Sequence, residues 1–282
     1  MESNNDINII LTCNGMNLEL LIATDILKLN SLHYGFWNNG EELTLSNLRK
    51  AQERYTVTLL ELIPNGVKTI LDVGCGIGDI ALTLAKKGYI VTAISPDKNH
   101  KKYFDKYKDK NISFYNKKFE DIKFDKKFDL ILLSESQGNF SPIITFKQCK
   151  RYLKKPGYLL VSNIFNRNNK PSLNGVNSTE QEYITQAKEY NLKLIESIDI
   201  TKEVLPTLQI AYNAHQQYFL PALSIFHHFI KKFAPLKYKL VKLFFYKQWK
   251  NLDRLRNYYE ERIDPSFFER ELSYKRILLM HQ

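Results

Sequence analysis

The clearest pattern of apolar and polar positions lies between residues 69 and 87. Thr69-Ile-Leu-Asp-Val73 is a short, almost continuous run of apolar, β-prone residues, which is typical of a strand buried on both faces. Glycines follow at positions 74, 76 and 78, and from Asp79 onward the apolar residues recur at helical spacing. The pattern predicts a strand, a tight glycine-rich turn and a helix, which is how a nucleotide-binding α/β sheet begins.

The α/β pattern extends along most of the chain. Apolar runs bounded by turn residues predict six further strands, at 89–94, 111–115, 128–133, 158–164, 192–200 and 274–280. Helical spacing predicts helices at 17–30, 45–63, 79–87, 143–153 and 180–190. We therefore expect an α/β domain with a mostly parallel sheet.

Two segments fall outside this alternation. Residues 1–54 are predicted to form an N-terminal helical and aromatic lid, and residues 202–271 a helical cap insertion before the last strand. The core is then predicted at 55–201 and 272–282. Phe219 to Arg256 mixes aromatic and aliphatic residues with many lysines, and Asp253 is its only acid. This part of the insertion is either a core-packing helix with a solvated basic face, or a cap that is apolar toward an acceptor pocket and basic outside.

Charge and cysteine content narrow the class further. The 282 residues carry a formal net charge of +11, which favours an anionic partner such as nucleic acid, a membrane surface or an acidic protein. The three cysteines show no paired spacing, the polar start does not resemble a secretory signal, and no apolar run is long enough to span a bilayer. We expect a cytoplasmic protein, with peripheral attachment to a membrane left open.

The residues around the glycine turn indicate the kind of ligand. The spacing is Asp-x-Gly-x-Gly-x-Gly, with Asp72 two residues before Gly74, and it differs from the Gly-x-Gly-x-x-Gly of dinucleotide folds. A carboxylate at this point repels a phosphate but suits a cationic ligand. Cys75, Gly76 and Gly78 complete the predicted cradle. The alternative is a glycine turn in an α/β unit that binds no ligand.

These residues resemble motif I of the class I S-adenosylmethionine (SAM) methyltransferases, whose ligand carries an ammonium and a sulfonium group. The segment His33-Tyr-Gly-Phe-Trp37 is similar to an element found upstream of motif I in the tocopherol-, sterol- and cyclopropane-type enzymes, which act on small molecules and lipids. The resemblance implies a Rossmann-like mixed seven-stranded sheet with helices on both faces, closed by an antiparallel hairpin. It also implies SAM as cofactor, with Tyr34 and Trp37 closing its site; a hydrophobic plug over the sheet is the alternative.

The resemblance also implies ligand contacts for residues at the ends of later strands. It implies a ribose contact near Ser95, Pro96 and Asp97, although Ser95 stands where the family usually has an acid and Asp97 is equally suited to cap the next helix. An adenine contact is implied for Phe119, Glu120 and Asp121, for which a solvated acidic turn is the alternative. Two residues after the fourth strand are expected at the reaction zone, where ligands bind in open parallel sheets, namely Ser134 and Glu135. Capping of the following helix is the alternative for Glu135.

The reaction implied is in-line transfer of the SAM methyl group, and the acceptor nucleophile needs a base. The candidates are Glu135, Tyr34 and His215 in that order, although a packed or exposed role is more common for a histidine such as His215. No metal site is expected, because the adjacent His227 and His228 diverge on a helix and no His-x-x-x-His or Cys-x-x-Cys spacing occurs.

The acceptor expected is a hydrophobic small molecule or an acyl or lipid-type group. It is either free or held on an acidic carrier protein or at an anionic membrane surface. RNA or protein methylation and a non-catalytic SAM-fold binding protein are the alternatives. Nucleic acid is disfavoured because the fourth strand lacks the Asn/Asp-Pro-Pro-Tyr of base-modifying enzymes and no RNA-binding module is appended.

Overall fold

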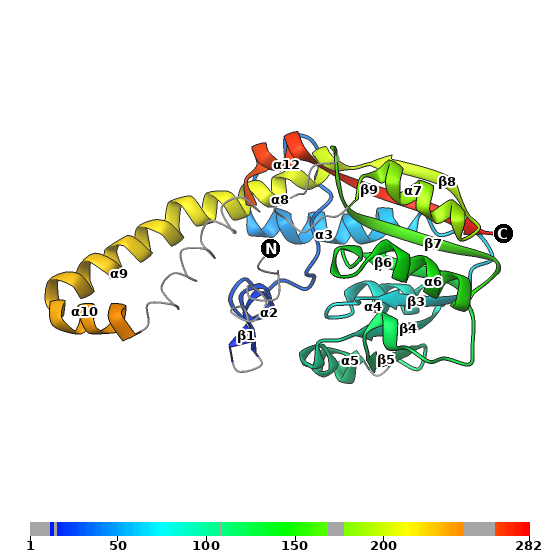
Figure 1. Ribbon diagram of the computed structural model, residues 1–282, viewed down its shortest axis with the longest axis horizontal. Coiled ribbons are helices and arrows are strands. Elements are labelled where there is room, and N and C mark those ends of the chain that lie inside the picture. The colour runs from blue at the N-terminus through cyan, green and yellow to red at the C-terminus, as the bar shows by residue number, and fades with distance from the viewer. Residues whose placement is uncertain (1–11, 14–15, 108, 169–177, 245–262) are drawn as a thin grey trace.

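The chain folds around one seven-stranded mixed sheet in the order β5-β4-β3-β6-β7-β9-β8 (Figure 1). This computed structural model describes residues 12–13, 16–107, 109–168, 178–244 and 263–282. The strands of the sheet are β3 (Thr69–Val73), β4 (Ile90–Ser95), β5 (Ile112–Asn116), β6 (Phe128–Ser134), β7 (Leu153–Asn166), β8 (Leu192–Asp199) and β9 (Leu272–His281). Strands β3 to β7 pair in parallel, and β9 is antiparallel to both of its neighbours. The predicted mixed sheet and its closing antiparallel hairpin are confirmed.

Helices cover both faces of the sheet and enclose two hydrophobic clusters. The helices are α2 (Leu18–Leu21), α3 (Leu45–Leu60), α4 (Asp79–Lys86), α5 (Lys101–Tyr107), α6 (Pro142–Tyr152), α7 (Glu180–Glu189), α8 (Thr201–Ala214), α9 (Leu220–Phe233), α10 (Pro235–Phe244) and α12 (Pro265–Glu271). One cluster joins β3 through Ile70 to α3, α4, α8 and α12, and the other joins β3 through Leu71 to α6 and α7. Successive residues of one strand thus enter opposite layers, which explains its continuous apolar run.

The order of the strands fixes where a ligand can bind. From β3 the chain proceeds outward through β4 to the edge strand β5, and then returns to the other side of β3 as β6. The connections leave β3 and β6 in opposite directions, and in open α/β sheets ligands bind beyond the carboxyl ends of the strands at such a point. The glycine turn and the segment that begins with Ser134 both lie at this switch point.

The N-terminal part differs from the single helix predicted over residues 17–30. A short hairpin of β1 (Thr12–Cys13) and β2 (Met16–Asn17) leads into α2, which continues as one π-helical stretch, η1 (Ile22–Ile26). The helix ends early, since Leu27 bonds back to Ile22 and Lys28 adopts a positive φ of 53°. Residues 1–11 of the predicted lid lie outside the described residues.

The insertion between β8 and β9 has two parts that pack differently. Helices α8 and α12 lie on the sheet and bury Val204, Leu208 and Phe268. Helix α9 continues from α8 through a π-helical turn, η5 (His215–Phe219), and extends away from the sheet, and α10 folds back at its far end (Figure 1). Residues 245–262 of the predicted cap lie outside the described residues. In the part of the chain that is described, no helix is long and apolar enough to cross a membrane.

Candidate functional site

The glycine turn after β3 has a backbone shape that requires glycine. Gly74, Gly76 and Gly78 all have positive φ values, of 72°, 52° and 85°. A Cβ atom on Gly74 would lie 2.4 Å from the Cβ atom of Ser136, so the turn and the segment after β6 are in contact. The amides of Gly74 and Cys75 donate to the Ile94 carbonyl at 2.9 and 3.2 Å, which ties the turn to β4. The turn is therefore held from both neighbouring strands.

Asp72 is the unusual residue of this region because its carboxylate is buried without full compensation. The residue is only 2% exposed, and its Oδ2 has no hydrogen-bond partner among the residues that the structure describes. Burial, together with the charge of Asp79, raises the pKa of Asp72 to about 7. An unpartnered buried carboxylate is costly, and a positively charged group placed beside it would stabilise its ionised form.

Two of the residues expected near a ribose, Ser95 and Asp97, bond to nearby residues of the chain at the end of β4. The Ser95 hydroxyl lies 2.9 Å from Nδ1 of His100 and is buried. Asp97 is the N-cap of the short turn η2 (Lys98–His100), where its Oδ1 accepts from the Asn99 amide at 2.8 Å. The structure thus shows the capping role that was the alternative for Asp97. The ribose contacts of Ser95, Pro96 and Asp97 stay a prediction.

The residues expected near adenine separate into a buried and an exposed group. Phe119 is buried in the hydrophobic cluster under α6, and its ring centroid lies 5.4 Å from that of Phe140. Glu120 and Asp121 belong to the short turn η3 (Phe119–Asp121) and are exposed, as in the acidic turn that was the alternative. They line a surface cavity of about 900 Å³ beside β5. An adenine contact for the three residues stays a prediction.

Residues 31–37 form a segment, here called the strap, that runs over α3 and joins distant parts of the chain. The Phe36 amide donates to the Ala51 carbonyl at 2.8 Å, on α3. The Gly35 amide and the Trp37 indole nitrogen both donate to Thr207 Oγ1 on α8, at 3.0 and 2.9 Å. Trp37 is 3% exposed and is packed as the plug that was the alternative to a lid. Its contact with a cofactor stays a prediction.

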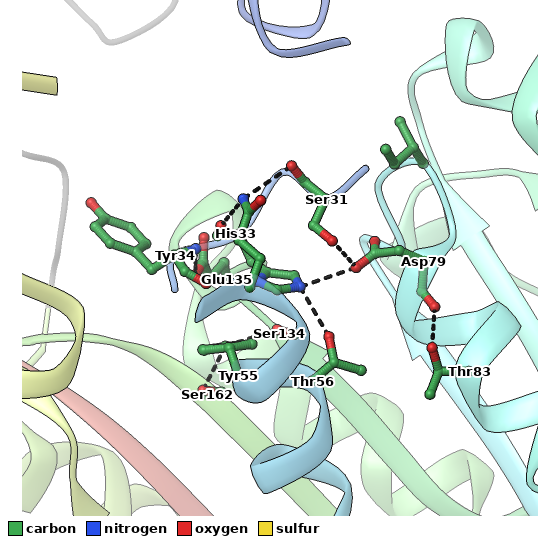
Figure 2. A network of polar contacts seen from close by, with 12 residues as sticks. Ser31, His33, Tyr34, Tyr55, Thr56, Asp79, Thr83, Ser134, Glu135 and Ser162 are labelled. Carbon is green, nitrogen blue, oxygen red and sulfur yellow. Dashed lines mark hydrogen bonds and ion pairs between the residues drawn. The ribbon is translucent and has the colours of Figure 1, made fainter. Parts of the chain in front are cut away.

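His33 connects the strap to the first turn of α4, as Figure 2 shows. Its Nε2 lies 3.0 Å from Oδ2 of Asp79, and its Nδ1 lies 2.7 Å from the Tyr34 carbonyl oxygen. Burial lowers the pKa of His33, but the charge and hydrogen bond of Asp79, with smaller contributions from Glu135 and the Tyr34 carbonyl, outweigh it, so the pKa is raised. Both ring nitrogens face acceptors, which is the arrangement that an imidazolium requires.

Glu135 sits directly after β6 with a strained backbone, at a φ of 57°. Its Oε1 accepts from the Tyr34 amide at 2.8 Å and from the Tyr274 hydroxyl at 2.7 Å. Among the described residues, no hydrogen bond uses its second carboxylate oxygen. Burial raises the pKa of Glu135, although the charge of His33 and the two hydrogen bonds oppose this effect. The strained backbone and the raised pKa make Glu135 a candidate base.

Tyr34 and His215, the other two candidate bases, occupy different surroundings. The Tyr34 ring points away from His33 in Figure 2 and meets the edge of Tyr274, at a centroid distance of 5.6 Å. His215 lies in the π-helical turn of the insertion and stacks on Phe219 at a centroid distance of 5.4 Å. Both of its ring nitrogens are buried and have no hydrogen-bond partner in the described part of the chain. No contact among the described residues brings His215 to Glu135. Its role as a base stays a prediction.

Four residues of the site were not predicted from the sequence. His33 and Asp79 form the link described above, while Tyr55 and Tyr274 join hydroxyls at 2.8 Å below Glu135. Tyr55 also lies 3.0 Å from Ser134 Oγ and donates to Ser162 Oγ at 2.8 Å. Asp79, an acid at the first position of α4, and His33, a histidine beside the aromatic residues of the strap, could have been identified as candidates from the sequence. The tyrosines became neighbours of Glu135 only through the sheet order. Among the described residues no group of three or more His, Cys, Asp or Glu could hold a metal ion.

Known proteins share the sequence pattern of residues 71–161 and the overall fold of the chain. Residues 71–161 match the family model of a methyltransferase domain. The chain is 29% identical over 159 residues to a ubiquinone biosynthesis O-methyltransferase of Rickettsia typhi, which covers 54% of this chain and 64% of the relative. The match therefore spans less than two thirds of the length of that relative.

Solved structures resemble the chain over nearly its whole length. The geranyl diphosphate C-methyltransferase from Streptomyces coelicolor, in complex with Mg²⁺, geranyl-S-thiolodiphosphate and S-adenosyl-L-homocysteine, has a TM-score of 0.69 at 14% identity, with 99% of this chain and 97% of that chain covered. The [4+2]-cyclase SpnF has a TM-score of 0.63 at 16% identity, with 94% and 95% covered. At these identities the likeness shows a shared fold, and the second example shows that the fold also occurs in a protein named for another reaction.

Proposed function

We propose that this chain is a class I SAM-dependent methyltransferase that transfers the SAM methyl group to a hydrophobic small molecule or acyl-type acceptor. Residues 71–161 match a methyltransferase domain, and the fold is that of the compared methyltransferases. The observation that supports this most directly is the buried Asp72 carboxylate with its unpartnered oxygen beside the glycine turn. A cationic nucleoside satisfies such a group, whereas a nucleotide phosphate does not.

The residues of the turn fit SAM in charge and in shape. Asp72 would hold a positive group of SAM. The positive φ values of Gly74, Gly76 and Gly78 shape the turn beside it, and the absence of side chains at Gly74 and Gly78 leaves room for Ser136 and Phe104. Asp79 and Glu135 add negative charge on two sides of the same region, since both affect the pKa of His33. When bound, SAM supplies an electrophilic methyl group.

Glu135 is positioned to act on the acceptor. Its Oε1 is fixed by the Tyr34 amide and the Tyr274 hydroxyl, which orient the carboxylate. Its raised pKa makes the Glu135 carboxylate a stronger base toward an acceptor hydroxyl, amine or acidic carbon. Most of the rate enhancement would come from holding the acceptor in line with the methyl group, an effect of about 7–11 kcal/mol at most.

An apolar acceptor is supported by the surfaces near the strap. Tyr34 packs with Phe268 and Tyr274, so the wall next to Glu135 is aromatic. The compared proteins are named for O-methylation in ubiquinone biosynthesis and for C-methylation of geranyl diphosphate. Both names fit a small-molecule acceptor for this chain as well.

Calorimetry of SAM binding tests the cofactor site. The wild type is expected to bind SAM and S-adenosylhomocysteine but neither NAD nor ATP, and Asp72→Ala and Gly76→Val are expected to abolish SAM binding. Asp105→Ala, at an exposed position on α5, and Gly138→Ala, where a Cβ meets nothing within 4 Å, are matched controls that should bind normally. Unchanged SAM affinity in both site variants would refute the assignment.

Transfer of a labelled methyl group from SAM tests the reaction class. The label is expected in an organic-solvent extract of small molecules and lipids, and Glu135→Gln should remove it while SAM still binds. Label in RNA or in protein would instead favour one of those acceptors. SAM binding with no label in any fraction would indicate a binding protein that does not transfer methyl groups.

A further inference from the structure

Helices α9 and α10 present a large apolar surface that no other described part of the chain covers. No residue of α9 is buried, and Phe226, Phe233 and Leu236 are 61%, 66% and 76% exposed. The two helices stand clear of the sheet in Figure 1. Such a contiguous exposed surface of large apolar side chains marks an interaction site.

The apolar residues of α9 form one stripe rather than a scattered set. Phe226, Phe229 and Phe233 recur at helical spacing, and the rings of Phe229 and Phe233 pack with a centroid distance of 4.7 Å. The polar face carries Ser224, His228 and Lys231.

The hairpin of α9 and α10 closes through polar side chains. His227 lies 3.3 Å from the Tyr238 hydroxyl, and their rings meet edge to face. On a helix, residue 227 is turned by about 100° from its neighbour Phe226, so this contact does not use the phenylalanine stripe. Phe226, Phe229 and Phe233 keep more than half of their surface exposed among the described residues.

The charge around this stripe has one sign. The described part of the hairpin carries Lys231, Lys232, Lys237 and Lys239, and the sequence has no Asp or Glu between Glu203 and Asp253. Two copies of the chain facing each other through this surface would bring like charges together, which is unfavourable. An apolar stripe on a helix hairpin whose formal charges are all lysines complements an anionic lipid surface, where the apolar residues enter the acyl boundary and the lysines meet the headgroups.

We propose that the exposed face of the α9–α10 hairpin docks this protein on the surface of an anionic lipid bilayer. Docking requires no methyl transfer, so its failure and the failure of the proposed function can be distinguished. The face comprises the stripe of Phe226, Phe229 and Phe233 on α9, and Leu236 adds an exposed apolar side chain at the start of α10.

Vesicle flotation with the full chain tests the proposal. Vesicles of phosphatidylcholine with phosphatidylglycerol are expected to carry the protein, phosphatidylcholine vesicles are not, and a high NaCl concentration, about 0.5 M, should reduce the bound fraction. Phe226→Ser with Phe229→Ser, and separately Lys231→Glu with Lys232→Glu, should each weaken partitioning by about tenfold or more.

Matched controls distinguish binding through this face from vesicle binding by any exposed apolar or positively charged residue. Ile143→Ser with Ile195→Ser removes two exposed apolar residues elsewhere, and Lys147→Glu with Lys150→Glu reverses two charges on α6. Both double variants should bind vesicles like the wild type, and all variants should bind SAM normally.

Three results would overturn the proposal. They are no binding to the anionic vesicles, equal losses in hairpin and control variants, or a stable dimer in solution that the phenylalanine variants disrupt. Capture of an acidic protein with no vesicle binding belongs to the first of these results.

Discussion

Asp72→Asn should stabilise the protein without ligand while it weakens SAM binding. Asp72 is only 2% exposed and has one carboxylate oxygen unpartnered, so the folded state holds its proton up to a pKa of about 7. Asparagine has nearly the same shape but no charge to desolvate. The variant therefore removes a cost of folding and the proposed charge partner of SAM together.

The magnitude follows from the two pKa values. The folded value of about 7 lies above the ordinary value of 3.8, so between these pH values the folded state binds more protons than the unfolded state. The stability of the wild type must therefore fall as the pH rises through this window. At 1.36 kcal/mol per pKa unit, Asp72 accounts for a loss of about 2–3 kcal/mol between about pH 5 and pH 8. The asparagine side chain of the variant cannot titrate, so the free energy of unfolding of the variant does not contain this pH-dependent loss.

Urea unfolding at pH 5 and pH 8 measures the effect, with SAM absent. The free energy of unfolding of Asp72→Asn minus that of the wild type should grow by about 2–3 kcal/mol from the lower to the higher pH. Calorimetry at pH 7.5 should show SAM affinity reduced at least about tenfold, the equivalent of losing one charged contact. A constant stability difference across this pH range, or SAM affinity equal to the wild type, would refute the reasoning.

The remaining predictions concern the residues around the turn. His33→Gln should lower the free energy of unfolding by about 1–3 kcal/mol in urea at pH 6. Because the pKa of His33 is raised above 6.5, this loss should shrink as the pH rises through the raised value, and a pH-independent loss would contradict an imidazolium bound to Asp79. Glu135→Gln should reduce kcat by about 10²–10⁴-fold with little change in the Kd of SAM, measured by label transfer and calorimetry; full activity would exclude it as the base. Gly74→Ala, whose Cβ would lie 2.4 Å from the Ser136 Cβ, should weaken SAM binding and lower Tm, whereas unchanged values of both would show that the turn tolerates a side chain.

Much of the sheet could be predicted because its strands are buried on both faces. Such strands read as continuous apolar runs, so the predicted limits of β3 agree with the structure residue for residue. The helix predicted over residues 17–30 failed, because its periodicity carried no information on the π-helical stretch and the positive φ at Lys28. Propensity is weak where a segment is short and its ends lack caps.

The site could be predicted only where it is local in sequence. Asp72 and the glycine turn belong to one stretch, and their spacing alone indicated the ligand class. The partners of Glu135 come from the strap and from β9, 101 and 139 residues away, and the sequence does not state that these segments meet. Phe119 and Trp37 illustrate the opposite problem, since an aromatic residue near a site looks the same in sequence whether it packs in the core or faces a ligand.

The strap makes the turn after β3 and the first helix of the insertion mechanically dependent on each other. If α8 swings outward, Thr207 either releases the two groups that donate to it or draws the strap along. In the second case His33 leaves Asp79 and the amide of Tyr34 leaves Glu135. Under the proposed function, admission of the acceptor past the insertion and release of Glu135, the proposed base, from the Tyr34 amide would then be a single event.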